Sequence, residues 1–236
     1  MQLKGCPLKC VYCYVDDEGI HGQQMDIEIP DLIRTAKEIT STDRRLHVFH
    51  LMGGAPALHI RRWSDVAKAM TESGMTDVVF HSDIVLAEPT LVKDFVPALQ
   101  KLTAYPKHLI AICIKGVTEE NFHENIGTTA FSLRESLENL RKVVHTGINY
   151  YLTLVNPEPS ALPSFLVRLS EMIGQENARR IKLLQVKPYN VTKSRFSQTP
   201  VSKNILEAMD QRFFAADKII DEFRREAKNH QFIHLV

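Results

Sequence analysis

The sequence has few cysteines, no long apolar run and almost no net charge. Four of its 236 residues are cysteine, too few for the disulfide framework of a small secreted protein. No apolar run is long enough to span a bilayer, and the N-terminus lacks the apolar core of a signal peptide. A formal net charge of +1 gives no overall attraction to nucleic acid. We therefore expect a cytoplasmic protein that has neither a membrane nor nucleic acid as its partner.

Length and hydropathy indicate one large globular domain. The 236 residues suit a single α/β barrel, and a hydrophobic content of 44% is ordinary for a globular protein. No low-complexity segment, internal repeat or interdomain linker interrupts the chain. We expect a main domain over residues 1–200, with residues 201–236 forming a C-terminal helix and a possible last strand packed on it.

Apolar segments of strand length alternate with amphipathic segments of helix length. This alternation predicts βαβ units and a mainly parallel sheet, which periodicity alone leaves either open or rolled into a barrel. Only Met1–Gly5 precede the first cysteine, so the first strand is very short or the chain is a fragment. The expected strands are Leu46–Met52, Asp77–His81, His108–Lys115, Ile148–Val155, Ile181–Val186 and Phe232–Val236. The expected helices begin at Pro30 or span Arg61–Ser73, Pro89–Leu102, Leu133–His145, Pro163–Ile173 and Ser202–Ala227.

Three of the four cysteines form a C-x3-C-x2-C motif near the N-terminus. Cys6, Cys10 and Cys13 are close enough for one loop to wrap a metal centre. A cubane iron–sulfur cluster normally takes four thiolates, so three local cysteines leave one iron without a protein ligand. A zinc site completed by His21 is an alternative. Three structural thiols without a metal are another, although buried cysteines are usually scattered and these are clustered.

This motif, with Tyr12 directly before the last cysteine, resembles the cluster loop of the radical S-adenosylmethionine (radical SAM) superfamily. The resemblance implies a [4Fe–4S] cluster held by Cys6, Cys10 and Cys13. It implies that S-adenosylmethionine chelates the fourth iron, and that Tyr12 lies near the cofactor. It also implies a partial, TIM-like (β/α)6 barrel whose cluster loop follows the first strand. Functional residues would then gather at the C-terminal ends of the strands.

A second segment, Gly53-Gly54-Ala55-Pro56, resembles the superfamily's Gly-Gly-Glu-Pro segment. In the family this segment contacts the amino group of S-adenosylmethionine, so Gly53, Gly54 and Pro56 are expected cofactor contacts. Ala55 replaces the usual glutamate, which removes a side-chain contact and leaves the backbone geometry. An ordinary turn between a strand and a helix is the alternative interpretation.

Polar residues at the ends of later strands complete the expected site. Ser82 matches a position where related enzymes approach the methionine carboxylate or the ribose, although a helix-entry turn explains it equally well. Thr153 and Asn156 match a later strand of the same family and are expected near the cofactor. Five scattered histidines have no metal-binding spacing and are interpreted as surface or core residues; they are His47, His50, His59, His81 and His108.

The stretch Cys113-Ile114-Lys115 resembles the Asp-x-Lys of glycyl-radical-activating enzymes, such as the pyruvate formate-lyase activator. The resemblance implies that Lys115 pairs with the cofactor carboxylate. Cys113 stands in place of the aspartate and is interpreted as a core thiol rather than a catalytic one. Asn190 stands where those enzymes have a histidine in a Pro-Tyr-His segment.

The function implied by the resemblance is radical catalysis. A reduced cluster would cleave S-adenosylmethionine to a 5′-deoxyadenosyl radical, which abstracts hydrogen from a substrate. The substrate would be a glycyl-radical enzyme, or alternatively a small molecule or peptide, and flavodoxin or ferredoxin would donate the electron. The resemblance therefore implies an oxidoreductase. A zinc-bound or cluster-bound binding module without turnover is the alternative from another class.

Overall fold

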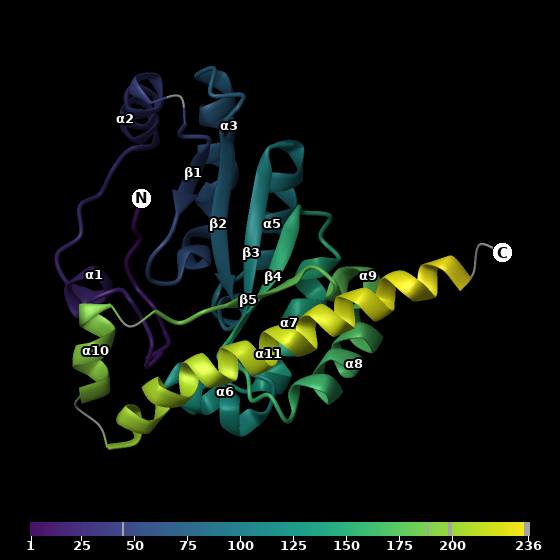
Figure 1. Ribbon diagram of the computed structural model, residues 1–236. Helices are drawn as coiled ribbons and strands as arrows, with labels where there is room; N and C mark the ends of the chain where they lie inside the picture. The colour runs from purple at the N-terminus through teal and green to yellow at the C-terminus, as the bar shows by residue number, and fades with distance from the viewer. Residues whose placement is uncertain (44, 188, 198–199, 234–236) are drawn as a thin grey trace. The chain divides into compact units, whose positions relative to one another are not determined.

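The computed structural model describes residues 1–43, 45–187, 189–197 and 200–233. Its five strands form one parallel sheet in the order β1-β2-β3-β4-β5 (Figure 1). The strands are β1 (Val48–Leu51), β2 (Val79–Val85), β3 (His108–Ile114), β4 (Tyr150–Val155) and β5 (Ile181–Leu184). The helices are α1 (Asp17–His21), α2 (Ile29–Thr42), α3 (Trp63–Glu72), α4 (Glu88–Leu91), α5 (Phe95–Lys101), α6 (Glu119–Ile126), α7 (Leu133–Val144), α8 (Leu162–Ile173), α9 (Gln175–Ala178), α10 (Asn190–Ser197) and α11 (Pro200–Ile233), with the 3₁₀ helices η1 (Pro56–Arg62) and η2 (Leu102–Ala104).

The order of the strands confirms the predicted α/β class. Each strand is hydrogen-bonded to the strand before it in the chain. In a doubly wound sheet, by contrast, the strand order reverses at a switch point. Sequential parallel strands are what a section of a (β/α) barrel requires. A first strand is represented by a single parallel bridge between Gln2 and Met52. The fold is therefore consistent with a partial TIM-like barrel that continues into a helical C-terminal part.

The chain divides into two compact units. Unit 1 comprises residues 1–7, 15–112 and 142–150, and unit 2 comprises residues 8–14, 113–141 and 151–236. The expected boundary between residues 200 and 201 stays a prediction. Among the described residues, no helix combines the length and the apolar content needed to cross a membrane.

Unit 1 is built on β1, β2 and most of β3. Phe80 is buried on one face of β2, where its ring lies 5.9 Å from the ring of Trp63 on α3. Burying a side chain of this size contributes about 1.5–3 kcal/mol. Ser82 and Ile84 follow Phe80 at alternate positions and are also buried. His81 and Asp83 must therefore project from the opposite face of the strand.

Unit 2 contains β4 and β5 with α6, α8 and α11. The long helix α11 contacts α8 and β5, and Figure 1 shows it running beside α8. Its Met209 packs with Tyr12 and Val155 in a small buried cluster. Helix α6 is capped by Thr118, whose side chain accepts a hydrogen bond from the Asn121 amide. This helix was not predicted from the sequence.

Several predicted elements differ from the structure. Strand β2 runs to Val85 instead of ending at His81, and the start of the expected helix Arg61–Ser73 belongs to η1. The expected helix Pro89–Leu102 is interrupted because Val92 is extended and Asp94 has a left-handed φ of 60°, so it forms α4, α5 and η2. The expected strand Phe232–Val236 is wrong in its first two residues, which belong to α11. Its last three residues lie outside the described part of the chain.

Candidate functional site

Within unit 1, the Gly-Gly turn packs backbone to backbone against the residue before Cys6. Gly53 and Gly54 have φ values of +78° and +45°, in the left-handed region that favours glycine. A Cβ on Gly54 would lie 2.5 Å from the Gly5 carbonyl oxygen. The next amide, that of Ala55, donates a 2.7 Å hydrogen bond to the same oxygen. The predicted cofactor segment and the start of the cysteine motif are therefore joined directly.

The buried carboxyl of Glu88 holds the other side of this turn. Pro56 has no amide hydrogen and begins η1, which leaves the next amides of that helix without helical acceptors. One Glu88 oxygen accepts from the Ala57 amide at 2.7 Å, and the other accepts from the Val85 amide at 2.6 Å. Burial raises the pKa of Glu88 to about 8, although the backbone donors act in the opposite direction. Sequence analysis missed Glu88. Its position shortly after a strand, where site residues of this fold gather, could have pointed to it.

Glu88 predicts a specific pH dependence of stability. Between its usual pKa of 4.5 and its folded pKa of about 8, the folded protein retains a proton that the unfolded chain releases. The free energy of unfolding should therefore fall as the pH rises from 4.5 to 8, by at most about 5 kcal/mol. The side chain of the Glu88→Gln variant cannot titrate. Its free energy of unfolding, measured by urea denaturation at each pH, should therefore not show this fall.

The same variant should be less stable than the wild type at pH 5. Its side-chain NH₂ must face one of the two backbone amides, and leaving a buried donor unpaired costs about 1–3 kcal/mol. Glu72→Gln is the matched control, because Glu72 is an exposed residue on α3. If the free energy of unfolding changed with pH by the same amount in wild type and in Glu88→Gln, the raised pKa of Glu88 would be contradicted.

Ser82 lies in the middle of β2, as the register partner of Leu51 at the end of β1, and not at the end of a strand as the sequence predicted. It is fully buried, and its hydroxyl donates a 3.0 Å hydrogen bond to the Leu51 carbonyl. This bond fastens the end of β1 to β2. The expected contact of Ser82 with the cofactor stays a prediction.

Within unit 2, Lys115 and Tyr12 lie beside two of the motif cysteines. The Lys115 ammonium lies 5.5 Å from the centroid of the buried Tyr12 ring, within the range of a cation–π contact. Burial alone would lower the pKa of Lys115, but Tyr12 and the thiols of Cys10, Cys113 and Cys13 raise it well above the usual value. Lys115 is therefore a partly buried cation beside the cysteine loop.

The donor set of the cysteine motif suits an iron–sulfur cluster. All four cysteines are thiols rather than disulfides; Cys6, Cys10 and Cys13 are half-buried and Cys113 is buried. The Cys13 amide donates to the Cys10 carbonyl at 3.0 Å, which closes a turn between these two thiols. Thr192 donates to the Cys13 carbonyl at 3.3 Å. Half-buried thiols on a fixed backbone are accessible to iron without unfolding.

A network of buried carboxamides surrounds the end of β4. Asn156 has a left-handed φ of 44°, and its carbonyl accepts hydrogen bonds from the side chains of Asn121 and Asn125. Its side-chain nitrogen donates to the Asn125 oxygen at 2.8 Å. The Asn156 side-chain oxygen is buried and has no hydrogen-bond partner among the described residues. Thr153 of β4 is buried as well, and the expected contacts of Thr153 and Asn156 with the cofactor stay predictions.

The structure also brings together residues that sequence analysis treated as scattered. The His50 Nε2 atom lies 3.1 Å from an Asp83 oxygen, and the rings of His50 and His81 are 4.3 Å apart in an edge-to-face arrangement. Burial and the nearby His50 lower the pKa of His81, while Asp83 opposes this effect. The parallel register, which places His50 beside His81, could not be read from the sequence.

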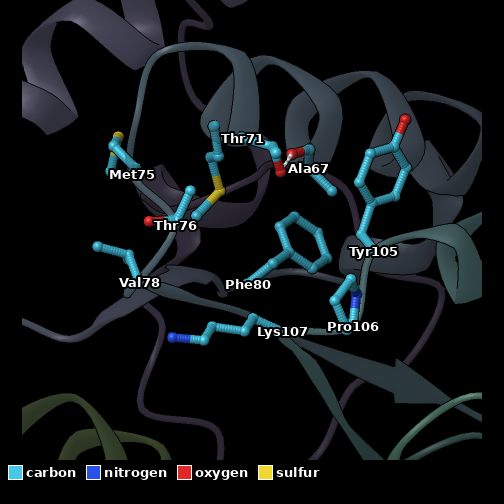
Figure 2. A pocket seen from close by; sticks show the side chains of 10 residues that line it. Ala67, Thr71, Met75, Thr76, Val78, Phe80, Tyr105, Pro106 and Lys107 are labelled. Carbon is cyan, nitrogen blue, oxygen red and sulfur yellow. Dashed lines mark hydrogen bonds between the residues drawn. The ribbon is translucent and has the colours of Figure 1, made fainter.

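A hollow of about 150 Å³ lies at the other ends of these strands. It is bordered by Met70 of α3 and by Val78, Phe80, Tyr105 and Lys107, at or near the starts of β2 and β3 (Figure 2). Its lining is largely apolar, and none of the predicted site residues contributes to it.

Comparison with known proteins identifies the class of this chain. The family model described as the Radical SAM superfamily matches residues 3–160, more than half of the sequence. The chain therefore belongs to the radical SAM superfamily. Members of this superfamily use a [4Fe–4S] cluster and S-adenosylmethionine. These are accordingly the cofactors of this chain. No curated protein sequence matches the chain.

Solved structures of radical SAM enzymes share its fold. Streptococcus suis SuiB bound to the precursor peptide SuiA is 12% identical with a TM-score of 0.57, over 86% of this chain and 43% of SuiB. A spore photoproduct lyase mutant is 17% identical with a TM-score of 0.54, over 84% and 60% of the two chains. The enzyme anSMEcpe with bound AdoMet is 12% identical with a TM-score of 0.53, over 82% and 55%. The chain thus spans about half the length of these proteins.

Proposed function

We propose that this chain is an oxidoreductase that cleaves S-adenosylmethionine reductively and uses the product radical to abstract hydrogen from a substrate. The observation that carries the proposal is the Gly53–Gly54 turn packed on Gly5, next to the first motif cysteine. When bound, the reduced cluster supplies one electron that separates S-adenosylmethionine into methionine and a 5′-deoxyadenosyl radical. The protein supplies the ligands, the orientation of the cofactor and the exclusion of water.

The proposed roles follow from the chemistry of each residue. The thiolates of Cys6, Cys10 and Cys13 bind three irons of the cluster. The Gly53–Gly54 backbone is assigned to the cofactor's amino group. The missing side chain of Gly54 lets this turn pack against the Gly5 carbonyl, which fixes its position. The further proposed contacts with the cofactor are Tyr12, Pro56, Ser82, Lys115, Thr153 and Asn156.

For Lys115 and Asn156 the contacts in unit 2 give specific support. Lys115 remains protonated beside Tyr12, so it can hold the cofactor's carboxylate but cannot bind iron. The orphaned Asn156 oxygen can accept a hydrogen bond from an amino or hydroxyl group of the cofactor.

The proposed substrate class depends on where this sequence matches the pattern of glycyl-radical-activating enzymes and where it departs from it. Lys115 fits the glycyl-radical-activating pattern, but Cys113 and Asn190 replace its acid and histidine. Among structures of the same fold, SuiB is bound to a precursor peptide and spore photoproduct lyase to a dinucleoside photoproduct. We propose a peptide or small-molecule substrate, with a glycyl-radical enzyme as the second possibility. A flavodoxin or ferredoxin in the cytoplasm would donate the electron.

A test of the proposal does not require the substrate. Anaerobically reconstituted protein reduced with dithionite should release 5′-deoxyadenosine and methionine in equal amounts. The cleavage needs only cluster, electron and cofactor, and without substrate the radical takes its hydrogen atom from the buffer or the protein. Chromatography with mass detection measures both products. Absence of both products with several reductants, in protein that carries iron and binds S-adenosylmethionine, would instead support a binding module without turnover.

Lys115→Ala should separate cofactor binding from cluster binding. The variant should retain its iron and lose at least tenfold in affinity for S-adenosylmethionine, about 1.4 kcal/mol, since the carboxylate loses its cation. Lys193→Ala is the control, because Lys193 is an exposed lysine of α10 in the same unit. Unchanged affinity in iron-loaded Lys115→Ala would remove Lys115 from the cofactor site.

A further inference from the structure

We infer that His50, His81 and Asp83 form a binding site for one divalent transition-metal cation, distinct from the cysteine motif. One ligand atom from each residue can be chosen so that all three lie within 4.8 Å of one another. Two imidazoles and one carboxylate are a donor set used by catalytic zinc and by non-haem iron. All three residues belong to unit 1, so this convergence is a property of one compact unit.

The sheet itself creates the cluster. His50 of β1 is the register partner of His81 of β2, and neighbouring strands lie about 4.8 Å apart. Asp83 follows His81 by two residues, so both side chains project from the same face of β2. Phe80, on the opposite face, packs against Trp63. The cluster therefore lies on rigid strands, on the face turned away from α3.

The spacing of the donors is close to that of a metal site. Zinc bonds to nitrogen and oxygen are about 2.0–2.1 Å long, which places tetrahedral ligand atoms roughly 3.3 Å apart. The His50 nitrogen and the Asp83 oxygen are 3.1 Å apart. This 3.1 Å contact is a hydrogen bond, and all three donor atoms lie within 4.8 Å of one another. A metal ion would replace the hydrogen bond, with side-chain rotation bringing the third donor to it.

The site is accessible and has room for another ligand. The side chains of His50 and Asp83 are 33% and 27% exposed, so a hydrated cation can reach them from solvent. Three protein ligands leave at least one position on a zinc ion open. Water or an oxygen or nitrogen atom of a substrate would fill it, as at other zinc sites that have three protein ligands.

Zinc content measures the site directly. Protein carrying its iron–sulfur cluster would be incubated with two equivalents of Zn²⁺, desalted and analysed for both metals. Wild type should retain about one zinc per chain, the stoichiometry of a single three-ligand site. His81→Ala and Asp83→Asn should each lose most of that zinc and keep their iron. His47→Ala is the matched control, since this exposed histidine lies three residues before His50.

X-ray absorption at the zinc edge distinguishes this site from the cysteines without any variant. Zinc on His50, His81 and Asp83 should show nitrogen or oxygen neighbours at about 2.0–2.1 Å and no sulfur at about 2.3 Å. Sulfur neighbours would assign the zinc to the cysteine motif and overturn the inference. Wild-type protein without zinc after desalting, or variants that retain it fully, would overturn it as well.

Discussion

Replacing Cys6, Cys10 or Cys13 with alanine is expected to remove the iron from the protein. Wild type reconstituted under anaerobic conditions should contain about four irons per chain, the content of one [4Fe–4S] cluster. Each single variant should fall to the background of protein reconstituted without sulfide. The reason is that a cluster left with two thiolates has two irons without protein ligands, and the cofactor can fill only one of these positions.

Cys113→Ala is the matched control for this loss. Cys113 is buried in β3 between Ile112 and Ile114, with 8% of its surface exposed. Removing one buried sulfur costs core packing, on the order of 1 kcal/mol, but no proposed ligand. Iron analysis and the absorption spectrum should match those of wild type. If Cys113→Ala also lost its iron, the cluster would be ligated by four cysteines and would have no position for S-adenosylmethionine.

Gly54→Ala is expected to lower the affinity for S-adenosylmethionine by ten- to a hundredfold, about 1.4–2.8 kcal/mol. Two costs combine at this position. A side chain at φ +45° is strained by about 1–2 kcal/mol, and the added Cβ would lie 2.5 Å from the backbone oxygen of Gly5. Either the Gly53–Gly54 turn or the backbone at Gly5 must move, and this movement displaces the turn from the cofactor. Calorimetry on iron-loaded protein measures the change.

Gly74→Ala separates strain from steric displacement. Gly74 has a φ of +84°, also in the left-handed region, but a Cβ there would meet nothing within 4 Å. This variant should lose about 1 kcal/mol of stability and keep its affinity for S-adenosylmethionine. Equal affinities in the two alanine variants would show that the Gly53–Gly54 turn does not contact the cofactor.

The five strands could be predicted because each combines apolar residues with a clear boundary. Strand β3, for example, has apolar residues at nearly every position and reads as a buried parallel strand. Helix α6 could not be predicted in the same way. Two of its buried residues, Asn121 and Asn125, are polar, and they are buried because they bind the Asn156 carbonyl. Such hydrogen bonds depend on strand β4, about 30 residues away, and leave no local periodicity.

The candidate site was predictable only where the motif is local. Cys6, Cys10 and Cys13 are neighbours in the chain, so their spacing carries information without any structure. His50 and His81 are 31 residues apart, and only the pairing of β1 with β2 brings them together. Glu88 was missed for a related reason, because its role depends on amides of Ala57 and Val85 rather than on a side-chain pattern.

The loop between the first two cysteines is held through its backbone. The Lys9 amide donates to the Ile126 carbonyl at 2.9 Å, and a Cβ on Gly127 would lie 2.2 Å from the Lys9 carbonyl oxygen. The side chain of Lys9 itself is exposed. For a protein engineer, position 9 is therefore a place where side chains can be exchanged, whereas position 127 has to stay glycine. The spacing of the metal ligands is set by the backbone and does not depend on the side chain at position 9.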